Sequence, residues 1–269
     1  MRTMTGTVPK NSVARPPAEA EPLPDAKRQT LVEHLEELRR RLWVCVISLL
    51  LFSIGGYFLA PRVIQWLKEP AGPFLPALAF FSPAEALMAH LKVALGVGAC
   101  VSVPIFLYEL WNFIRPGLTA RERVMGFSFV VWGTLLFATG VVFAYWGLLP
   151  VSLRFLLTFG EGTLTPVISI SHYLSFTAAV VLSCGVLFEL PVLVFFLTRL
   201  GILSPKLLRE KWRVAFLGIV TAAALLTPTQ DVLTLLLMAL PLLGLYGVSI
   251  LVATVAVPET KRPQPLQNK

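Results

Sequence analysis

Residues 104–123 hold most of the side chains in this sequence that could recognise a charged ligand. The stretch reads PIFLYELWNFIRPGLTARER and lies between two long apolar runs. It contains acids, arginines and aromatic residues, among them Tyr108, Glu109, Trp111, Phe113, Arg115, Arg121, Glu122 and Arg123. Pro116-Gly117 predicts a turn in its middle. Polar groups that gather at one connection between apolar segments indicate a recognition site.

Two acids brought together by such a turn would form a site for a guanidinium group, which donates to carboxylates in a planar fork. Glu109 lies near the end of an apolar run, with no opposite charge within four residues. If the turn returns Glu122 towards Glu109, both acids lie near the membrane interface, and aromatic neighbours could stack on the guanidinium. Glu122 also completes the capping-box pattern Thr119-x-x-Glu122, so helix capping remains an alternative role.

Glu189 is a second candidate, because it is an acid near the middle of an apolar run. A charge at the bilayer centre costs at least about 2.5–3.5 kcal/mol, so such residues usually face a cavity or a partner. Pro191 follows two residues later and removes a backbone donor, which predicts a break in the helix. We expect Glu189 to serve a polar cavity or a docking partner, and an interhelical hydrogen bond is the structural alternative.

The sequence lacks the motifs of several other functions. It has no G-x-x-x-x-G-K phosphate cradle and no His-Glu-x-x-His, and its three cysteines lie singly in apolar runs. We therefore expect no nucleotide hydrolysis, cofactor, metal site or disulfide framework. An intramembrane serine protease, with Ser128 as nucleophile and His172 as base, is a weak alternative. Its motif Gly-Phe-Ser-Phe lacks the second glycine of a nucleophile elbow, and Ser128 lies early in a predicted helix. We predict a protein that is not an enzyme.

The elements that must position these residues are membrane-spanning helices. The chain of 269 residues is 56% hydrophobic and 14% charged, whereas a soluble domain has roughly 25% charged residues. Several apolar runs reach about 18–26 residues, enough to cross a hydrocarbon core roughly 30 Å thick. We predict an all-α polytopic membrane protein with six transmembrane helices, at about 42–59, 84–111, 124–149, 172–199, 214–226 and 232–257.

The expected domain organisation follows from the same pattern. Residues 1–29 are rich in proline, alanine and charge and predict a disordered tail, residues 30–257 form one membrane domain, and 258–269 form a polar tail. Thr30-x-x-Glu33 and the leucines after it predict an amphipathic helix at the membrane surface that leads into the first span. Pro61 is expected to end that span. The fifth apolar run has only about 13 residues, or roughly 20 Å of helix.

The distribution of basic residues predicts the orientation. Eight of the 23 Lys and Arg lie in residues 1–41, three in 111–123, five in 199–213 and three in 258–269. The positive-inside rule puts these segments in the cytoplasm, so both termini are cytoplasmic and the short fifth helix must cross. The formal net charge of +8 is therefore mainly an orientation signal, and we expect the lipid bilayer rather than nucleic acid as its partner.

Taken together, the motifs between Leu31 and Tyr246 resemble those of the TatC family, the multispanning subunit of the twin-arginine protein translocase. They are His34-Leu35-x-Glu37-Leu38-Arg39-x-Arg41-Leu42; Pro104-x-x-x-Tyr108-x-x-Trp111-x-Phe113-x-x-Pro116-Gly117-Leu118 with Glu122-Arg123; Phe143-x-Tyr145 with Pro150; Phe188-Glu189-Leu190-Pro191; and Thr227-Pro228 with Asp231, Pro241 and Tyr246. The middle block is long and unusual, which makes the resemblance specific.

The resemblance implies a receptor in the bacterial cytoplasmic (inner) membrane that binds twin-arginine signal peptides at the cytoplasmic face. Such receptors assemble with TatA/TatB-like single-span proteins and other TatC copies, and they export folded proteins with the proton-motive force. It also implies a concave, glove-like arrangement with short fifth and sixth helices. The implied signal-peptide residues are Glu122, Phe113, Glu109, Glu37, Arg39 and Leu42, and Glu189 would be the intramembrane docking residue.

The chain departs from the family pattern at three positions. Many relatives have glutamine where this chain has Glu109, some have a polar residue at Leu235, and an acid is common at Gly247. The added acid should strengthen arginine binding or shift its pH dependence, and the other two departures affect partner contacts. The alternative function is a proton-coupled secondary transporter of a small solute, with Glu189 as its coupling site.

Overall fold

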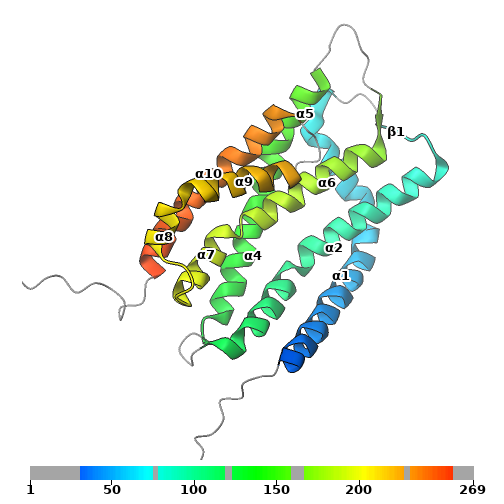
Figure 1. The fold of residues 1–269 in the computed structure, drawn as a ribbon. Helices are drawn as coiled ribbons and strands as arrows, with labels where there is room; N and C mark the ends of the chain where they lie inside the picture. Colours follow the sequence, from blue (N-terminus) through cyan, green and yellow to red (C-terminus); the bar gives the residue numbers. More distant parts are fainter. Residues whose placement is uncertain (1–30, 75–77, 119–122, 159–166, 227–230, 257–269) are drawn as a thin grey trace, which may run out of the picture.

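The computed structural model describes residues 31–74, 78–118, 123–158, 167–226 and 231–256, and Figure 1 shows their arrangement. The α-helices are α1 Leu31–Lys68, α2 Pro83–Ile114, α4 Gly126–Phe143, α5 Leu149–Thr158, α6 Ile170–Leu187, α7 Leu190–Arg199, α8 Pro205–Glu210, α9 Trp212–Leu226 and α10 Val232–Ala256. The same residues also contain two 3₁₀ helices, one short π-helix and two short strands: η1 Glu69–Phe74, η2 Arg115–Gly117, η3 Ala144–Leu148, β1 Leu78–Ala79 and β2 Ile168–Ser169. The expected tails lie outside the described residues.

The predicted all-α membrane architecture is confirmed for the described residues. Five helical segments are long and apolar enough to cross a bilayer: Val32–Gly72, Pro83–Ile114, Gly126–Thr158, Ile170–Arg199 and Val232–Ala256. The predicted fifth span corresponds to α9, which has 15 residues and is short, as expected. The sixth is not short, because α10 continues for 25 residues through Pro241. Its apolar run contains no charged residue.

The first helix corrects the prediction that Pro61 ends a helix. α1 is one helix of 38 residues that contains both the expected surface segment and the expected first span, with Pro61 inside it. Ala60 and Ile64 on either side of the proline are buried, and their packing offsets the single hydrogen bond that proline removes. Ending the helix there would leave up to four carbonyls without partners in an apolar medium.

The third helical segment also runs beyond its predicted end at residue 149. α4 continues through the short π-helix η3 into α5, which ends at Thr158. Pro150 lies just after the π-helical segment η3, and the helix continues past it. By contrast, the predicted break near Pro191 is confirmed, since α6 ends at Leu187 and α7 begins at Leu190.

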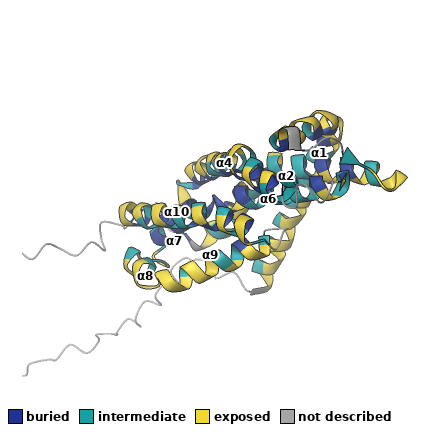
Figure 2. Cartoon of the chain, turned by 90° about the horizontal axis from the view of Figure 1, so that it is seen from above, coloured by how far each residue is buried: buried dark blue, intermediate teal, exposed yellow. Residues whose placement is uncertain are grey.

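The most buried elements are α6 and α7, and the helices around them face outwards (Figure 2). In the segment Ile170–Arg199, 61% of the most apolar window is buried, against 11% in the segment that contains α1. α1 therefore lies at the edge of the bundle, beside α2, as Figure 1 also shows. Its position leaves the beginning of α1 and the end of α2 accessible together.

α1 and α2 pack closely because small residues line their contact. A Cβ added to Gly98 of α2 would lie 2.8 Å from the backbone nitrogen of Ser53 and 2.9 Å from its Cα. One added to Gly56 of α1 would lie 2.7 Å from the carbonyl oxygen of Ala94. Small residues allow such close backbone approach in membrane helices. The packing fixes the register that brings the two helix ends together.

At the other end of α1, hydrogen bonds join segments that are distant in sequence. β1 pairs in parallel with β2, and the Glu85 carboxylate accepts hydrogen bonds from Ser169 Oγ and from the backbone N–H of Phe81. Ser82 precedes α2, and its side chain makes no capping hydrogen bond. The hydroxyl of Tyr173 in α6 donates to the carbonyl oxygen of Leu67 at 2.6 Å.

Replacing Tyr173 with phenylalanine is expected to destabilise the protein by about 1 kcal/mol. The change leaves one of the last carbonyls of α1 without its donor, at a side chain that is 3% exposed. The thermal unfolding midpoint of the purified protein in detergent measures the effect. Tyr57→Phe is the matched control, because Tyr57 is 43% exposed and should show no shift. An equal midpoint for Tyr173→Phe and wild type would contradict the prediction.

Candidate functional site

Three charged residues meet where α1 begins and α2 ends. Nη1 of Arg41 donates to Oε2 of Glu109 at 3.1 Å, and Nε of Arg41 donates to Oε1 of Glu37 at 3.2 Å. Nη2 of Arg41 also contacts Oε1 of Glu37. A single guanidinium thus joins an acid of its own helix to an acid of α2. We call these three residues the charged cluster.

Helix geometry explains why the charged cluster forms. Glu37 and Arg41 are four residues apart, so they lie on one face of α1. That face packs against α2, where Glu109 lies one turn before Phe113. The side chains of Arg41, Glu37 and Glu109 are 22%, 19% and 14% exposed. The cluster is therefore partly shielded from solvent, and its ion pairs are stronger than those of a fully exposed surface.

An aromatic contact lies beside the charged cluster, towards the start of α1. The His34 ring stacks on the Phe113 ring, with centroids 4.4 Å apart and planes 22° apart. His34 precedes Glu37 by three residues and Phe113 follows Glu109 by four, so the two contacts are neighbouring layers of one helix pair. Both rings are half-buried. Phe113, predicted from the sequence, is thus placed beside Glu109 and Glu37.

The remaining predicted residues are placed differently. Arg39 and Leu42 are exposed and lie on faces of α1 other than that of the charged cluster, with Leu42 60% exposed. Glu122 lies outside the described residues. Its neighbour Arg123 is described, and Arg123 Nε donates to the carbonyl oxygen of Leu118 at 3.1 Å. The structure thus brings together three predicted site residues, and Arg39 and Leu42 lie outside that group.

Trp111 of the sequence block has another role than stacking on a guanidinium. Trp111 is 5% exposed and packs against Phe129 of α4 and Phe196 of α7, with ring centroids 5.3 and 5.1 Å away. It is a core residue that joins α2 to the centre of the bundle. Tyr108 is 54% exposed, and no ring contact is recorded for it among the described residues.

Two members of the site were missed by sequence reasoning. Arg41 was not paired with an acid, although its spacing from Glu37 is typical of a helical ion pair. Its contact with Glu109 spans 68 positions, and no local pattern could indicate it. The stacking of His34 on Phe113 is likewise a contact between helices, which only the packing of α1 on α2 creates.

Glu189 lies in the break between α6 and α7 and is 8% exposed. Both carboxylate oxygens are buried, and neither has a hydrogen-bond partner among the described residues. They lie over Gly133 of α4, where an added Cβ would be 3.0 Å from Oε2 of Glu189 and 2.6 Å from Cδ1 of Leu107. Only a glycine leaves room for the carboxylate there. The interhelical hydrogen bond, which was the structural alternative for Glu189, is not seen among the described residues.

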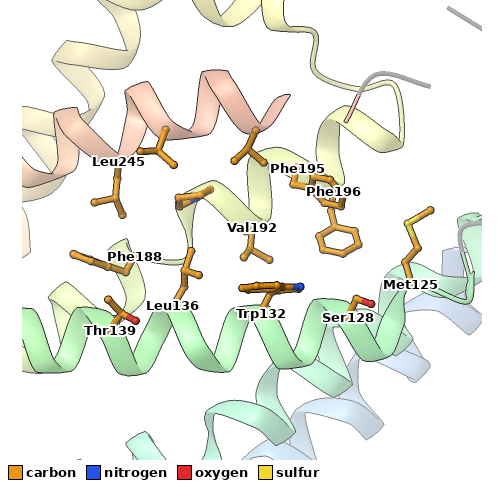
Figure 3. Close-up of a pocket in the computed structure, with 13 residues that line it drawn as sticks. Met125, Ser128, Trp132, Leu136, Thr139, Phe188, Val192, Phe195, Phe196 and Leu245 are labelled. Atoms are coloured by element: carbon orange, nitrogen blue, oxygen red, sulfur yellow. The ribbon is translucent and has the colours of Figure 1, made fainter. Parts of the chain in front are cut away.

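An apolar groove of about 660 Å³ lies next to Glu189, between α4, α7 and α10. Figure 3 shows side chains of α4, such as Trp132 and Leu136, pointing towards Val192 and Phe195 across the groove. Phe188 and Pro191, on either side of Glu189 in the sequence, also line it. The Glu189 carboxylate contacts α4 at Gly133 and is not part of this lining. The groove therefore offers an apolar surface, with a buried acid behind it.

Comparisons with known proteins match this chain over most of its length. The family model described as Sec-independent protein translocase protein (TatC) matches residues 33–241. A Sec-independent protein translocase protein TatC from Carboxydothermus hydrogenoformans is 38% identical over 233 residues, which are 87% of this chain and 96% of that protein. The TatC protein of Helicobacter pylori strain J99 is 36% identical, over 87% of this chain and 92% of that protein.

A chloroplastic relative and a solved structure give the same result. The chloroplastic TATC protein of Arabidopsis thaliana is 36% identical over 226 residues, covering 84% of this chain and 66% of that protein. A crystal structure of a twin-arginine translocase receptor TatC superposes with a TM-score of 0.74 at 35% identity. The match covers 83% of this chain and 99% of the crystallised one.

Proposed function

This chain belongs to the TatC family, the receptor component of the twin-arginine translocase, and we propose that its charged cluster is part of the surface that binds a signal peptide's paired arginines. Family membership makes the chain a multi-pass membrane protein and a non-enzymatic transport component. It decides against the small-solute transporter and the intramembrane protease. Signal peptides and translocase partners are its ligands in general terms, and the residues that bind them are the subject of the proposal.

The observation that carries the proposal is the position of the Arg41 guanidinium. It contacts Glu37 on α1 and Glu109 on α2 at the same time. Two carboxylates that hold one guanidinium within the chain have the separation needed to hold one from a ligand. In the proposed site, Phe113 flanks the acids, and Glu122 contributes a third acid after the turn at Pro116. Arg39 and Leu42 would contact the peptide on the exposed faces of α1.

The proposed orientation has this end of the bundle in the cytoplasm. Three basic segments lie at helix ends: residues 1–41 at the start of α1, residues 111–123 at the end of α2, and residues 199–213 at the end of α7. By the positive-inside rule, these ends face the cytoplasm. Both termini would then be cytoplasmic, and α9 would cross despite its 15 residues. A signal peptide would meet the charged cluster before it enters the membrane.

The docking of partners is proposed for the second part of the site. Single-span TatA/TatB-like helices would pack along the apolar groove between α4, α7 and α10, and other copies of this chain would complete the assembly. The Glu189 carboxylate behind the groove, which has no hydrogen-bond partner among the described residues, would accept a hydrogen bond from a donor of a partner helix. Transport of folded proteins would follow, driven by the proton-motive force, with no cofactor and no nucleic acid involved.

Site-specific photocrosslinking of a twin-arginine signal peptide tests the binding surface. Glu122→Ala is expected to abolish the crosslink, and Glu37→Gln is expected to weaken it at least about tenfold, because each removes an acceptor of charge-assisted bonds. Glu36→Gln is the matched control, since Glu36 is exposed on the same helix. Each variant must still insert into the membrane. Full crosslinking by Glu122→Ala and Glu37→Gln would refute the proposed site.

A further inference from the structure

We propose that Arg41 is an internal stand-in for the signal's arginine, so that the unliganded receptor occupies its own binding site. The incoming guanidinium must displace Arg41 from Glu109 and Glu37 before it can bind. This inference rests on the function proposed above and adds to it a residue of the chain that competes with the ligand. Under this proposal, competition by Arg41 lowers the apparent affinity of the receptor for a signal peptide.

The geometry of Arg41 matches that of a bound ligand. Its Nε and Nη2 both donate hydrogen bonds to Oε1 of Glu37, and its Nη1 donates to Oε2 of Glu109. All three guanidinium nitrogens are thus engaged by two carboxylates from two helices. A planar fork held in this way is the arrangement by which a carboxylate site recognises arginine rather than lysine. Arg41 therefore fills the place for which the two acids are arranged.

Burial leaves little room for a second guanidinium beside the first. The side chains of Glu109 and Glu37 are 14% and 19% exposed, and Arg41 is 22% exposed. On the side towards the start of α1, the stacked rings of His34 and Phe113 form the neighbouring layer of the same helix pair. A ligand's arginine cannot reach both acids while Arg41 lies between them, so binding requires exchange rather than addition.

The charges of the cluster support the same conclusion. With Arg41 in place, Glu37 and Glu109 together with Arg41 have a net charge of −1. When Arg41 turns out to solvent, the two acids carry −2, which matches the two positive charges of a twin-arginine motif. Arg41 has a long and flexible side chain, and it can leave the acids without any movement of the α1 backbone. The neighbouring Arg40 is already exposed.

Glu109 is essential to this device because it connects Arg41 to α2. Without an acid at this position, Arg41 would keep only the pair with Glu37 on its own helix, a contact of the kind that contributes little on helix surfaces. Glu109 therefore strengthens the binding of the peptide's arginine and also strengthens the binding of its competitor, Arg41. These two effects on peptide affinity oppose each other, and Arg41→Gln removes the second one.

The test measures binding of a fluorescent twin-arginine peptide, and of its twin-lysine counterpart, to the purified full-length chain in lipid nanodiscs. Arg41→Gln is expected to raise the affinity for the twin-arginine peptide about tenfold, because the competitor is gone. Arg40→Gln is the matched control, since it removes the same charge one position away. It should change the affinity less than about twofold by general electrostatic attraction.

Each outcome has a defined meaning. Equal or weaker twin-arginine binding by a folded Arg41→Gln would overturn the proposal and make Arg41 a residue that positions the two acids. If Arg41→Gln does not fold, Arg41→Lys carries the test, because lysine keeps the charge but loses the fork, and a severalfold gain is expected. No gain would overturn the proposal. A wild type that binds both peptides equally would instead refute the proposed function itself.

A double-mutant cycle adds a readout that a purely structural role of Arg41 does not produce. Glu109→Gln should weaken peptide binding more in the Arg41→Gln background than in the wild type. In the wild type, losing Glu109 also loosens the competitor, which compensates part of the loss. In the Arg41→Gln background, only the ligand loses an acceptor. A smaller effect of Glu109→Gln in the Arg41→Gln background than in wild type would contradict competition.

Discussion

A Glu189→Leu variant is expected to insert and fold at least as well as the wild type and to export no folded substrate. Leucine is apolar and of similar size, and it removes two buried carboxylate oxygens that have no hydrogen-bond partner among the described residues. Burying such groups costs free energy, so their loss should stabilise the isolated protein. The same change removes the one polar side chain of this break between the described helices α6 and α7.

The measurements separate folding, signal binding and transport. The unfolding midpoint of Glu189→Leu should equal or exceed that of wild type, and crosslinking of the signal peptide at the charged cluster should persist. Export of a folded reporter protein should be lost. Glu189→Gln is the matched control, because it keeps the shape and the hydrogen-bonding capacity, and it should weaken partner assembly or transport only in part. Full transport by Glu189→Leu would refute a functional role for this residue.

A Gly98→Ala variant is expected to lose about 3 kcal/mol of stability and, with it, the charged cluster. The added Cβ would lie 2.8 Å from the backbone nitrogen of Ser53 and 2.9 Å from its Cα. These are backbone atoms of α1, so relief requires that the helices separate, at the upper end of the cost of overpacking. Separation also moves Arg41 away from Glu109, whose contact depends on the register of the two helices.

Gly96→Ala provides the control on the same helix. Apart from its chain neighbours and the backbone of its own helix, no atom of the described residues lies within 4 Å of a Cβ added there. The substitution should therefore be neutral or should stabilise the helix by up to about 1 kcal/mol. Unfolding midpoints compare the two variants, and crosslinking of a twin-arginine peptide reports on the cluster. If Gly98→Ala unfolds at the same temperature as Gly96→Ala and crosslinks fully, the close contact of α1 and α2 does not position the site.

The sequence by itself determined the class of the protein, the number and approximate location of its apolar segments and its family. These properties depend on local composition, and a bilayer translates apolar length directly into helices that cross it. Local chemistry also predicted the break at Glu189 from Pro191, although Pro61 and Pro241 lie inside continuous helices. Where the predicted ends were wrong, at Pro61 and at residue 149, the packing of neighbouring helices outweighed a local signal.

Only the tertiary structure decided which polar residues act together. Glu109 has no opposite charge near it in the sequence, yet it pairs with Arg41, 68 positions away. The tertiary structure also places Trp111 in the core and Phe113 against His34, although Trp111 and Phe113 belong to one short block of the sequence. The physical reason is that a contact between helices depends on their register. Here the close approach of Gly98 to Ser53 and of Gly56 to Ala94 sets the register of α1 against α2.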